Sequence, residues 1–348
     1  MLFTPCSVSA SPHCPATGRT TPPPRPRRTP QGINVTALRE VKLLRELRSP
    51  HIVRLLDVFP QKRGVALVFE YAEGDLEEVI KDRSLVLSAG DVKAYMQQVL
   101  AALAHCHARW VVHRDVKPNN FLVAADGGLR LADFGLARLY ASPERPYTNQ
   151  VFARWYRAPE LFFGSTCYGP GVDVWAAGCV FAELLTRRPW FAAESDVEVL
   201  TKVFMALGTP ADEEWAGLRH MPGFVEFQAT PAPPLRSLFP AAGDDALDLL
   251  ARLAALDPRR RISAADALRH RYFRADPAPT PADQMPRLHR REAAPGRGAA
   301  AAAAGEGKRP GAADGDAGGA PKRSRLEEEG GAAPERLALG SAFDDAAG

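Results

Sequence analysis

The sequence predicts an α+β fold in which a small β layer comes first and a larger, mostly helical part follows. Apolar residues repeat at helical spacing over 38–44, where the folded region begins. Two short apolar runs, 52–59 and 65–71, follow as predicted strands, and the turn-forming residues 60–64 separate them. Helical spacing dominates the rest, which is typical of an α+β domain whose helices segregate from its sheet.

The helical part is predicted from four further stretches of the chain. Over 92–103, apolar residues fall three or four positions apart and therefore share one helix face. The same spacing predicts helices over 172–185, 197–207 and 245–256.

Composition limits the class of protein. The chain has 348 residues, of which 46% are hydrophobic, so a sizeable core can be buried. The net charge of +3 is too close to neutral to indicate a nucleic-acid or membrane surface, and we expect neither partner. The five cysteines include no C-x-x-C pair, so no zinc or disulfide framework is indicated. No apolar run approaches the roughly 20 residues of a membrane-spanning helix.

The globular region lies between two ends of low complexity. Residues 1–31 are rich in Pro, Ser, Thr and Arg and contain no acidic residue. We expect an unstructured arm or a wrongly assembled first exon there, and a transit peptide of similar composition is the alternative. Residues 276–348, rich in Ala and Gly, predict a disordered tail.

Two basic clusters lie in this tail. Lys308-Arg309 is followed, after a spacer, by Lys322-Arg323-Ser324-Arg325. This spacing fits a bipartite nuclear-localisation pattern. We therefore predict a nuclear protein and leave a cytoplasmic share open.

The strongest functional signal is a series of four short strings in a fixed order. Residues 113–120 read H-R-D-V-K-P-N-N, and 131–135 read L-A-D-F-G. A-P-E follows at 158–160 and D-V-W at 173–175. This series resembles the catalytic loop, metal loop, activation-segment end and following helix of protein kinases.

The resemblance implies a protein-kinase-like two-lobed fold. Residues 32–73 would form a truncated small β lobe with one helix and about two to three strands. Residues 74–275 would form a mainly α-helical large lobe. The resemblance also implies ATP and Mg²⁺ as cofactors.

The residue types in the series fit phosphoryl transfer. A carboxylate must orient the attacking hydroxyl and accept its proton, and Asp115 is placed for this task. Mg²⁺ prefers oxygen ligands, which Asn120 and Asp133 can supply. Lys117 can reach the transferred phosphate as a point charge. His113 is expected to pack under the loop and support its backbone.

The first predicted helix resembles the cyclin-docking helix of cyclin-dependent kinases, since residues 34–40 read N-V-T-A-L-R-E. An amphipathic surface helix is the alternative. Either Asn34 or Thr36 can cap its start. Glu40 matches the carboxylate that pairs with the ATP-positioning lysine of active kinases. The docking residues implied are Asn34, Thr36, Ala37, Leu38, Arg39 and Glu40.

A regulatory site is implied between the metal loop and A-P-E. Thr148 matches the threonine that kinases of this family phosphorylate for activation, and Ser142, before a proline, is a second candidate. A phosphothreonine needs arginine partners. The matching arginines are Arg39, Arg114 and Arg138.

Further strings narrow the resemblance to the CDK-activating kinases, the cyclin-H-dependent kinases associated with TFIIH. They include K-A-Y-M at 93–96, R-W-Y-R-A-P-E-L at 154–161 and A-A-G-D-D at 241–245. The resemblance implies a cyclin-H-like partner and an assembly factor of the MAT1 kind. It implies protein substrates of two types, the activation segments of other cyclin-dependent kinases and the carboxy-terminal repeats of RNA polymerase II.

The resemblance also places an adenine pocket and a structural ion pair. The pair is Glu160 with Arg261. The residues implied for ATP are Phe69 as gatekeeper, Glu70 and Ala72 in the hinge, Asp75 as a ribose contact, and Leu122 and Ala132 on the pocket floor.

The sequence departs from the kinase pattern in two places. It contains no G-x-G-x-x-G loop before the docking helix, and its first lysine is Lys42, so Glu40 lacks its usual partner. Ala153 stands where the family has a threonine that bonds the catalytic Asp and Lys, and we expect impaired catalysis. Either the gene product is truncated or misassembled near 31–32, or the chain is a non-catalytic cyclin-binding module.

Overall fold

The computed structural model describes residues 35–61, 64–140 and 153–288. All of them belong to one unit, Met1–Arg291. The arm predicted at 1–31 lies outside the described residues, and so do the two basic clusters. No helix among the described residues is long and apolar enough to cross a membrane.

The amino-terminal elements are one helix and one strand pair. Helix α1 (Val35–Glu46) is followed by β1 (Leu55–Gln61) and β2 (Gly64–Phe69), which pair antiparallel. On α1, Leu43 and Leu44 are buried, because the helix packs one apolar face onto the core. The helix includes Thr36 within Val35–Glu46, so Thr36 cannot be its cap. The other predicted cap, Asn34, lies outside the described residues.

The first predicted strand begins later than expected. Ile52 belongs to a different pairing, because it forms an isolated parallel bridge with Leu131. The Val53 N–H donates to the Leu131 carbonyl at 3.0 Å, and the Leu131 N–H donates to the His51 carbonyl at 2.9 Å. The apolar run at 52–59 therefore contributes to two sheets, with Ile52 bridging to β6 and the residues from Leu55 pairing with β2. The sequence alone does not reveal this division.

A second sheet and a small ladder hold the catalytic segments. The sheet has the order β3 (Ala72–Asp75), β5 (Phe121–Ala124) and β6 (Leu129–Leu131), all antiparallel. The ladder pairs β4 (Val111–Val112) with β7 (Arg138–Leu139). These strands have two to four residues, too short for an alternating pattern to predict them.

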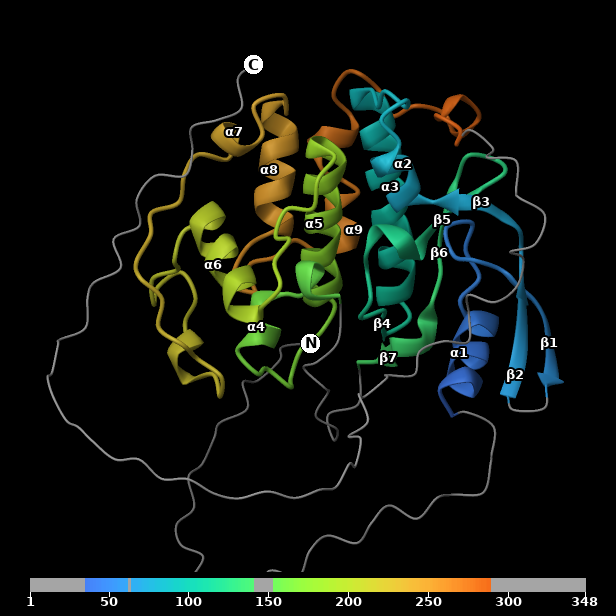
Figure 1. Cartoon of the computed structure of the whole chain (residues 1–348), viewed down its shortest axis with the longest axis horizontal. Helices are drawn as coiled ribbons and strands as arrows, with labels where there is room; N and C mark the ends of the chain where they lie inside the picture. The colour runs from blue at the N-terminus through green and yellow to red at the C-terminus, as the bar shows by residue number, and fades with distance from the viewer. Residues whose placement is uncertain (1–34, 62–63, 141–152, 289–348) are drawn as a thin grey trace, which may run out of the picture. The chain divides into compact units, whose positions relative to one another are not determined.

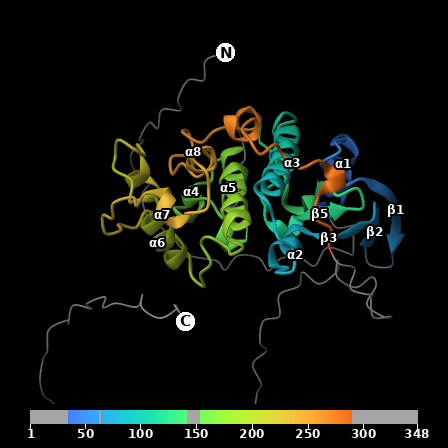
Figure 2. The same cartoon turned by 90° about the horizontal axis from the view of Figure 1, so that it is seen from above.

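Helices form the larger part of the described chain. Figures 1 and 2 show α5 (Gly171–Thr186) between α3 (Ala89–His107) and α8 (Asp244–Leu253). Nearly all of α5 is buried, including the indole of Trp175. The remaining α-helices are α2 (Leu76–Lys81), α4 (Pro159–Phe162), α6 (Asp196–Leu207), α7 (Leu235–Leu238) and α9 (Ala264–Ala267).

Short 3₁₀ turns connect these helices and carry several site residues. They are η1 (Pro118–Asn120), η2 (Phe134–Leu136), η3 (Arg154–Tyr156), η4 (Leu218–His220), η5 (Arg271–Phe273) and η6 (Ala282–Gln284).

The predicted start of the disordered tail at residue 276 is wrong. Residues 276–288 lie in the described part of the chain and include η6. Met285 is only 3% exposed, so the segment contributes to the core. Composition did not predict this because the segment is held to the core by a few specific contacts, such as those of Met285, which average composition does not reveal.

Candidate active site

The catalytic loop gathers Asp115, Lys117 and Asn120 around one carboxylate oxygen. Lys117 Nζ lies 2.8 Å from Asp115 Oδ2, and Asn120 Nδ2 donates to the same oxygen at 3.0 Å. Asn120 Nδ2 also donates to the Asp115 carbonyl at 2.7 Å. The 3₁₀ turn η1 follows Lys117 directly and carries Asn120 at its end. The loop therefore closes on itself and fixes the Asp115 side chain. The structure thus brings together the three residues predicted to be catalytic.

A buried aspartate on α5 anchors the loop backbone. Asp173 accepts hydrogen bonds from the backbone N–H groups of His113 (2.8 Å) and Arg114 (2.9 Å). His107 Nε2 lies 3.0 Å from the same carboxylate. Arg114 has φ of +68°, a conformation that costs energy for a non-glycine residue and is held here by these bonds. The string D-V-W at 173–175 was the sequence signal for this anchor, but no role was predicted for Asp173.

His113 ties the catalytic loop to the metal loop. Its ring is fully buried, and Nε2 lies 3.0 Å from the Ala132 carbonyl. The ring also meets Phe134 edge-on, with centroids 4.8 Å apart. His113 therefore has the supporting place that the sequence predicted.

Asp133 and Asn120 offer the oxygen atoms expected of a magnesium site. The Ala132 N–H donates to the Asn120 carbonyl at 2.8 Å, so the residue next to Asp133 is joined directly to Asn120. Asp133 is exposed, with φ of +60°, and accepts a bond from the Gly135 N–H at 3.3 Å. Asn120 uses its amide nitrogen on Asp115, and its amide oxygen is the atom with lone pairs for a hard cation.

This donor set fits Mg²⁺ held jointly with phosphate. Among the described residues, no three His, Cys, Asp or Glu side chains cluster into a cage of their own. Mg²⁺ usually takes one or two protein oxygens and completes its shell with water and substrate phosphates. Two oxygens, from Asn120 and Asp133, are what such a site requires.

Glu40 on α1 faces the metal loop. Burial raises the pKa of Glu40, the Asp133 carboxylate raises it further, and a hydrogen bond from the Phe134 backbone N–H lowers it again in part. Among the described residues, no lysine or arginine forms an ion pair with Glu40. The carboxylate therefore lies where kinases place it, without the lysine that usually accompanies it.

Three of the residues predicted for ATP lie on two neighbouring strands. The ladder pairs Asp75 of β3 with Leu122 of β5, and Ala72 is on the same strand as Asp75. Asp75 also caps α2 by accepting from the Glu78 N–H at 2.9 Å, and burial raises its pKa. Ala132 follows β6, the next strand of the sheet.

The other two pocket residues lie at the end of β2. Phe69 is half-buried against the core. The Glu70 N–H donates to the Arg54 carbonyl at 3.1 Å, so its carbonyl, rather than its N–H, is the backbone group suited to adenine. The Glu70 carboxylate accepts from the Arg54 N–H at 2.8 Å, which rigidifies this corner of the hinge.

The docking and switch predictions fall partly outside the described residues. Thr148, Ser142 and Asn34 lie outside them, and the Thr36, Ala37 and Arg39 side chains are not described. Leu38 is 50% exposed on α1, as a docking residue should be. The β4–β7 ladder pairs Val112 with Arg138. Because Arg114 follows Val112 by two residues, this pairing brings Arg138 near Arg114.

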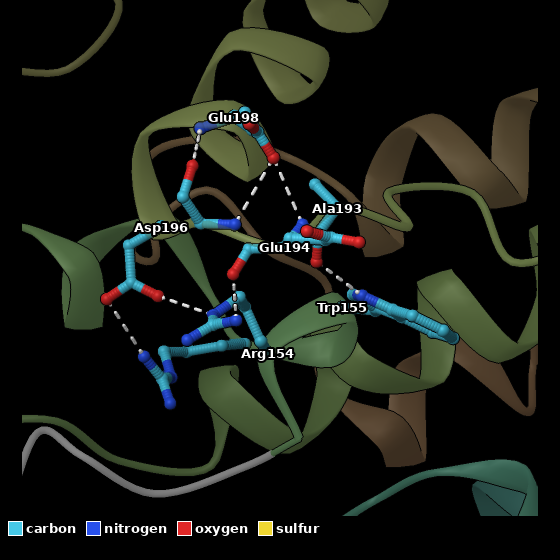
Figure 3. A network of polar contacts seen from close by, with 8 residues as sticks. Arg154, Trp155, Ala193, Glu194, Asp196 and Glu198 are labelled. Carbon is cyan, nitrogen blue, oxygen red and sulfur yellow. Dashed lines mark hydrogen bonds and ion pairs between the residues drawn. The ribbon is translucent and has the colours of Figure 1, made fainter.

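A polar network fixes the chain where it leaves the predicted activation segment. Figure 3 shows Arg154 and Trp155 bound to the start of α6. Arg154 Nε donates to Asp196 Oδ1 at 2.8 Å, and Trp155 Nε1 donates to the Ala193 carbonyl at 2.8 Å. The helix start is itself held by a capping box between Ser195 and Glu198. Ala153, directly before this network, has no hydroxyl to bond Asp115.

The predicted structural ion pair is present. Arg261 donates to both oxygens of Glu160, at 2.6 and 2.7 Å, and both side chains are buried. Arg261 also donates to the Ala255, Leu256 and Gly171 carbonyls. The pair joins the A-P-E string to the segment after α8.

Comparison with known proteins identifies the family. A family model described as the protein kinase domain matches residues 26–273. The chain belongs to the protein kinase family. The two-lobed α+β kinase fold predicted from the sequence is confirmed by this match and by the similarity to a solved kinase complex described below.

Similar kinases place the chain among the cyclin-dependent kinases. Cyclin-dependent kinase D-1 of Oryza sativa subsp. indica is 58% identical over 257 residues, which cover 74% of this chain and 61% of that kinase. Cyclin-dependent kinase 7 of Xenopus laevis is 52% identical over 256 residues, covering 74% of this chain and 73% of that kinase. The chain thus spans about 61% of the length of its curated rice relative.

A solved structure extends the likeness to three dimensions. The structure of the CAK complex from Chaetomium thermophilum, bound to ATP-gamma-S, contains a chain that matches with a TM-score of 0.71 and 42% identity. The match covers 76% of this kinase and 84% of that chain. The resemblance to CDK-activating kinases is therefore confirmed at the level of family and fold.

Proposed function

We propose that this chain is the catalytic part of a protein serine/threonine kinase of the cyclin-dependent family. It would transfer the γ-phosphate of ATP to Ser or Thr of protein substrates. The observation that carries the proposal is the convergence of Lys117 and Asn120 on one oxygen of Asp115, with Asp133 joined to Asn120 through Ala132. Phosphoryl transfer needs positioning and charge more than covalent chemistry, and this arrangement supplies both.

Each residue has a task in this proposal. Asp115, with Oδ2 held by two donors, orients the substrate hydroxyl through its other oxygen and takes its proton. Lys117 places positive charge beside the transferred group. Asn120 and Asp133 would hold Mg²⁺, which neutralises phosphate charge when bound. The nucleotide would be held by the residues that the resemblance implies for ATP: Phe69, Glu70, Ala72, Asp75, Leu122 and Ala132.

The substrates and partners we propose follow the CDK-activating kinases. The protein substrates would be activation segments of other cyclin-dependent kinases and the RNA polymerase II carboxy-terminal repeats. A cyclin-H-like subunit and an assembly factor of the MAT1 kind would be the partners. Support comes from the similarity to a chain of the CAK complex and from the half-exposed Leu38 on the predicted docking helix. We also propose that the protein is nuclear, because the two basic clusters of the tail fit a nuclear-localisation pattern.

We also propose that Thr148 is a regulatory phosphosite. Its phosphate would be held by Arg39, Arg114 and Arg138, which come from the docking helix, the catalytic loop and the segment after the metal loop. The pairing of Arg138 with Val112 supports a common site for the last two. Thr148→Ala should then lower activity, and Ser142→Ala would report on the weaker candidate.

The alternative of a non-catalytic cyclin-binding module draws support from Glu40, which has no lysine partner among the described residues, but the catalytic loop and the relatives favour the kinase. The three catalytic-loop side chains are retained and mutually bonded. The named relatives are kinases.

The test compares two polar positions, four residues apart, in one assay with a co-expressed cyclin-type subunit. Asp115→Asn should lower kcat by roughly 10²–10⁴-fold while nucleotide affinity stays the same, because general-base positioning is lost. Asn119→Ala is the matched control, since Asn119 is exposed and donates to Glu77 at 2.6 Å, away from Asp115. Full activity of Asp115→Asn would contradict the proposal.

A further inference from the structure

The segment 275–288, here called the C-terminal strap, lies beyond the residues 26–273 that match the kinase family model. Figures 1 and 2 show it in orange, running from the end of the helical part past α3 toward β3. Its Met285 is 3% exposed, and Leu288 packs against the core. The strap is therefore a folded part of the large unit with contacts of its own.

A buried lysine holds the first turn of the strap. Lys93 of α3 is 3% exposed, and its Nζ donates to the Ala275 carbonyl at 2.5 Å and to the Pro277 carbonyl at 2.8 Å. The ammonium group also lies 5.1 Å from the centre of the Tyr272 ring. Burying an ammonium group costs free energy unless the group is hydrogen-bonded. The two strap carbonyls supply these bonds, so the burial of Lys93 depends on the strap being in place. Burial lowers the pKa of Lys93, against the raising effect of Asp245 and Asp276.

Two glycines provide the surface on which the middle of the strap lies. Gly90 accepts from the Thr280 N–H at 3.1 Å, and a Cβ there would lie 2.9 Å from the Ala278 carbonyl oxygen. A Cβ on Gly127 would lie 2.3 Å from the Ala282 carbonyl oxygen. Thr280 Oγ1 lies closest to the Gly90 Cβ position, at 2.8 Å, but at both glycines a backbone carbonyl oxygen of the strap also lies under 3.0 Å away. Any side chain at either glycine would therefore displace the strap.

The end of the strap reaches the nucleotide strand. A Cβ on Gly74 would lie 2.4 Å from Leu288 Cδ1, which places the leucine directly on β3. Gly74 is paired with Val123, and the next residue, Asp75, is paired with Leu122. The strap therefore packs onto the strand that carries the proposed ribose contact.

We propose that the C-terminal strap positions β3 for the nucleotide, with Lys93 and Gly90 as the residues that anchor it. The strap connects α3 of the large lobe to Asp75, so its loss lets β3 move without disturbing the catalytic loop. Lys93 and Gly90 are positioning residues, since neither touches the nucleotide residues directly. This inference rests on the proposed kinase function.

The experiment compares variants of the full chain with its cyclin-type subunit. Gly90→Ala is the sharpest probe, because alanine favours the helix that contains Gly90 while its Cβ excludes the strap. Lys93→Met removes the other anchor, and Lys93→Arg keeps the charge as a partial rescue. Gly243→Ala is the matched control: Gly243 also lies at a helix start, and nothing is within 4 Å of its Cβ position.

The expected result is a split between the kinetic constants. The KM for ATP should rise roughly tenfold in Gly90→Ala and Lys93→Met, the scale of one lost positioning interaction, while kcat and the KM for the protein substrate stay unchanged. Lys93→Arg should recover part of the loss, and Gly243→Ala should behave as wild type. Equal effects on kcat, or an unchanged KM for ATP, would overturn the inference.

Hydrogen exchange separates this inference from the proposed function. In both anchor variants the amides of Gly74 and Asp75 should exchange faster, whereas the amides of β6 should not change. This readout needs no activity, so it still tests the strap if the chain proves not to be a kinase. Unchanged exchange at Gly74 and Asp75 would refute the positioning role even in an active enzyme.

Discussion

At the scale of residues, the site is built from side chains that each hold another in place. Asp115 is fixed by Lys117 and Asn120, and Asp173 fixes the backbone that presents Asp115. Charge-assisted bonds of this kind are about twice as strong as neutral ones. They can therefore hold Arg114 in its unfavourable left-handed backbone conformation. The chemistry therefore depends on a buried anchor as much as on the exposed carboxylate of Asp133.

The Glu160–Arg261 pair gives a stability prediction at this scale. Arg261→Met should lower the free energy of unfolding by about 3–5 kcal/mol, because it leaves the Glu160 carboxylate buried and unpaired. Urea unfolding followed by circular dichroism measures the change. The double variant Glu160→Leu/Arg261→Met should lose less, since no buried charge remains. A double variant less stable than Arg261→Met would contradict this explanation.

Two histidines give a pH prediction. Burial lowers the pKa of both His51 and His105 from the ordinary value of 6.5, and the nearby Arg130 and Arg109 lower it further. The unfolded chain then binds these protons more readily than the folded one. The contribution of these two histidines to stability is thus fully present above pH 6.5. It falls as the pH drops toward their lowered pKa values in the folded state.

Melting temperatures between about pH 7.5 and about pH 5.5 measure this dependence. The fall in the wild type should be smaller in His105→Gln, which cannot take up the proton. An identical pH profile in the two proteins would show that His105 does not contribute.

At the scale of elements, length decided what could be predicted. Apolar spacing located α3, α5, α6 and α8 to within a few residues, because each runs for ten residues or more and buries a continuous face. The strands of the second sheet have three or four residues and no such pattern. Their positions follow from pairing between segments that are distant in sequence.

The capping box of α6 allows a prediction for one element. Ser195→Ala should cost about 1 kcal/mol, since it removes the side-chain acceptor for the Glu198 N–H. Because Arg154 binds Asp196 at the first position of this helix, the variant should also increase hydrogen exchange around η3. Thr201→Ala, in the middle of the same helix and exposed, is the control and should change neither property.

At the scale of the whole molecule, α1 would connect the proposed partner binding to the site. One side of α1 carries the half-exposed Leu38, while Glu40 bonds to the Phe134 backbone in the metal loop. A subunit bound to this helix would therefore act on the residues around Asp133 through a rigid element. This is the physical basis for the cyclin dependence that we propose.

The docking surface is tested by charge insertion. Leu38→Asp should abolish binding of the cyclin-type subunit, measured by pull-down and by calorimetry, without changing the melting temperature of the free chain. An aspartate there would be desolvated in the complex but remain solvated in the free protein. Val86→Asp is the control, because Val86 is 88% exposed on the large lobe. Equal binding by both variants would exclude α1 as the docking element.

The sequence by itself determined the chemistry of this protein: the four ordered strings identified the catalytic loop and the metal loop, and the family resemblance that they carry implied the Glu160–Arg261 pair. Local strings suffice for this because phosphoryl transfer constrains residue type and spacing within one loop. Only the tertiary structure decided that Asp173 and His107 anchor that loop, that Ile52 pairs with Leu131, and that the chain remains folded to Leu288. Each of these depends on contacts between segments far apart in sequence, whose partners no local pattern specifies.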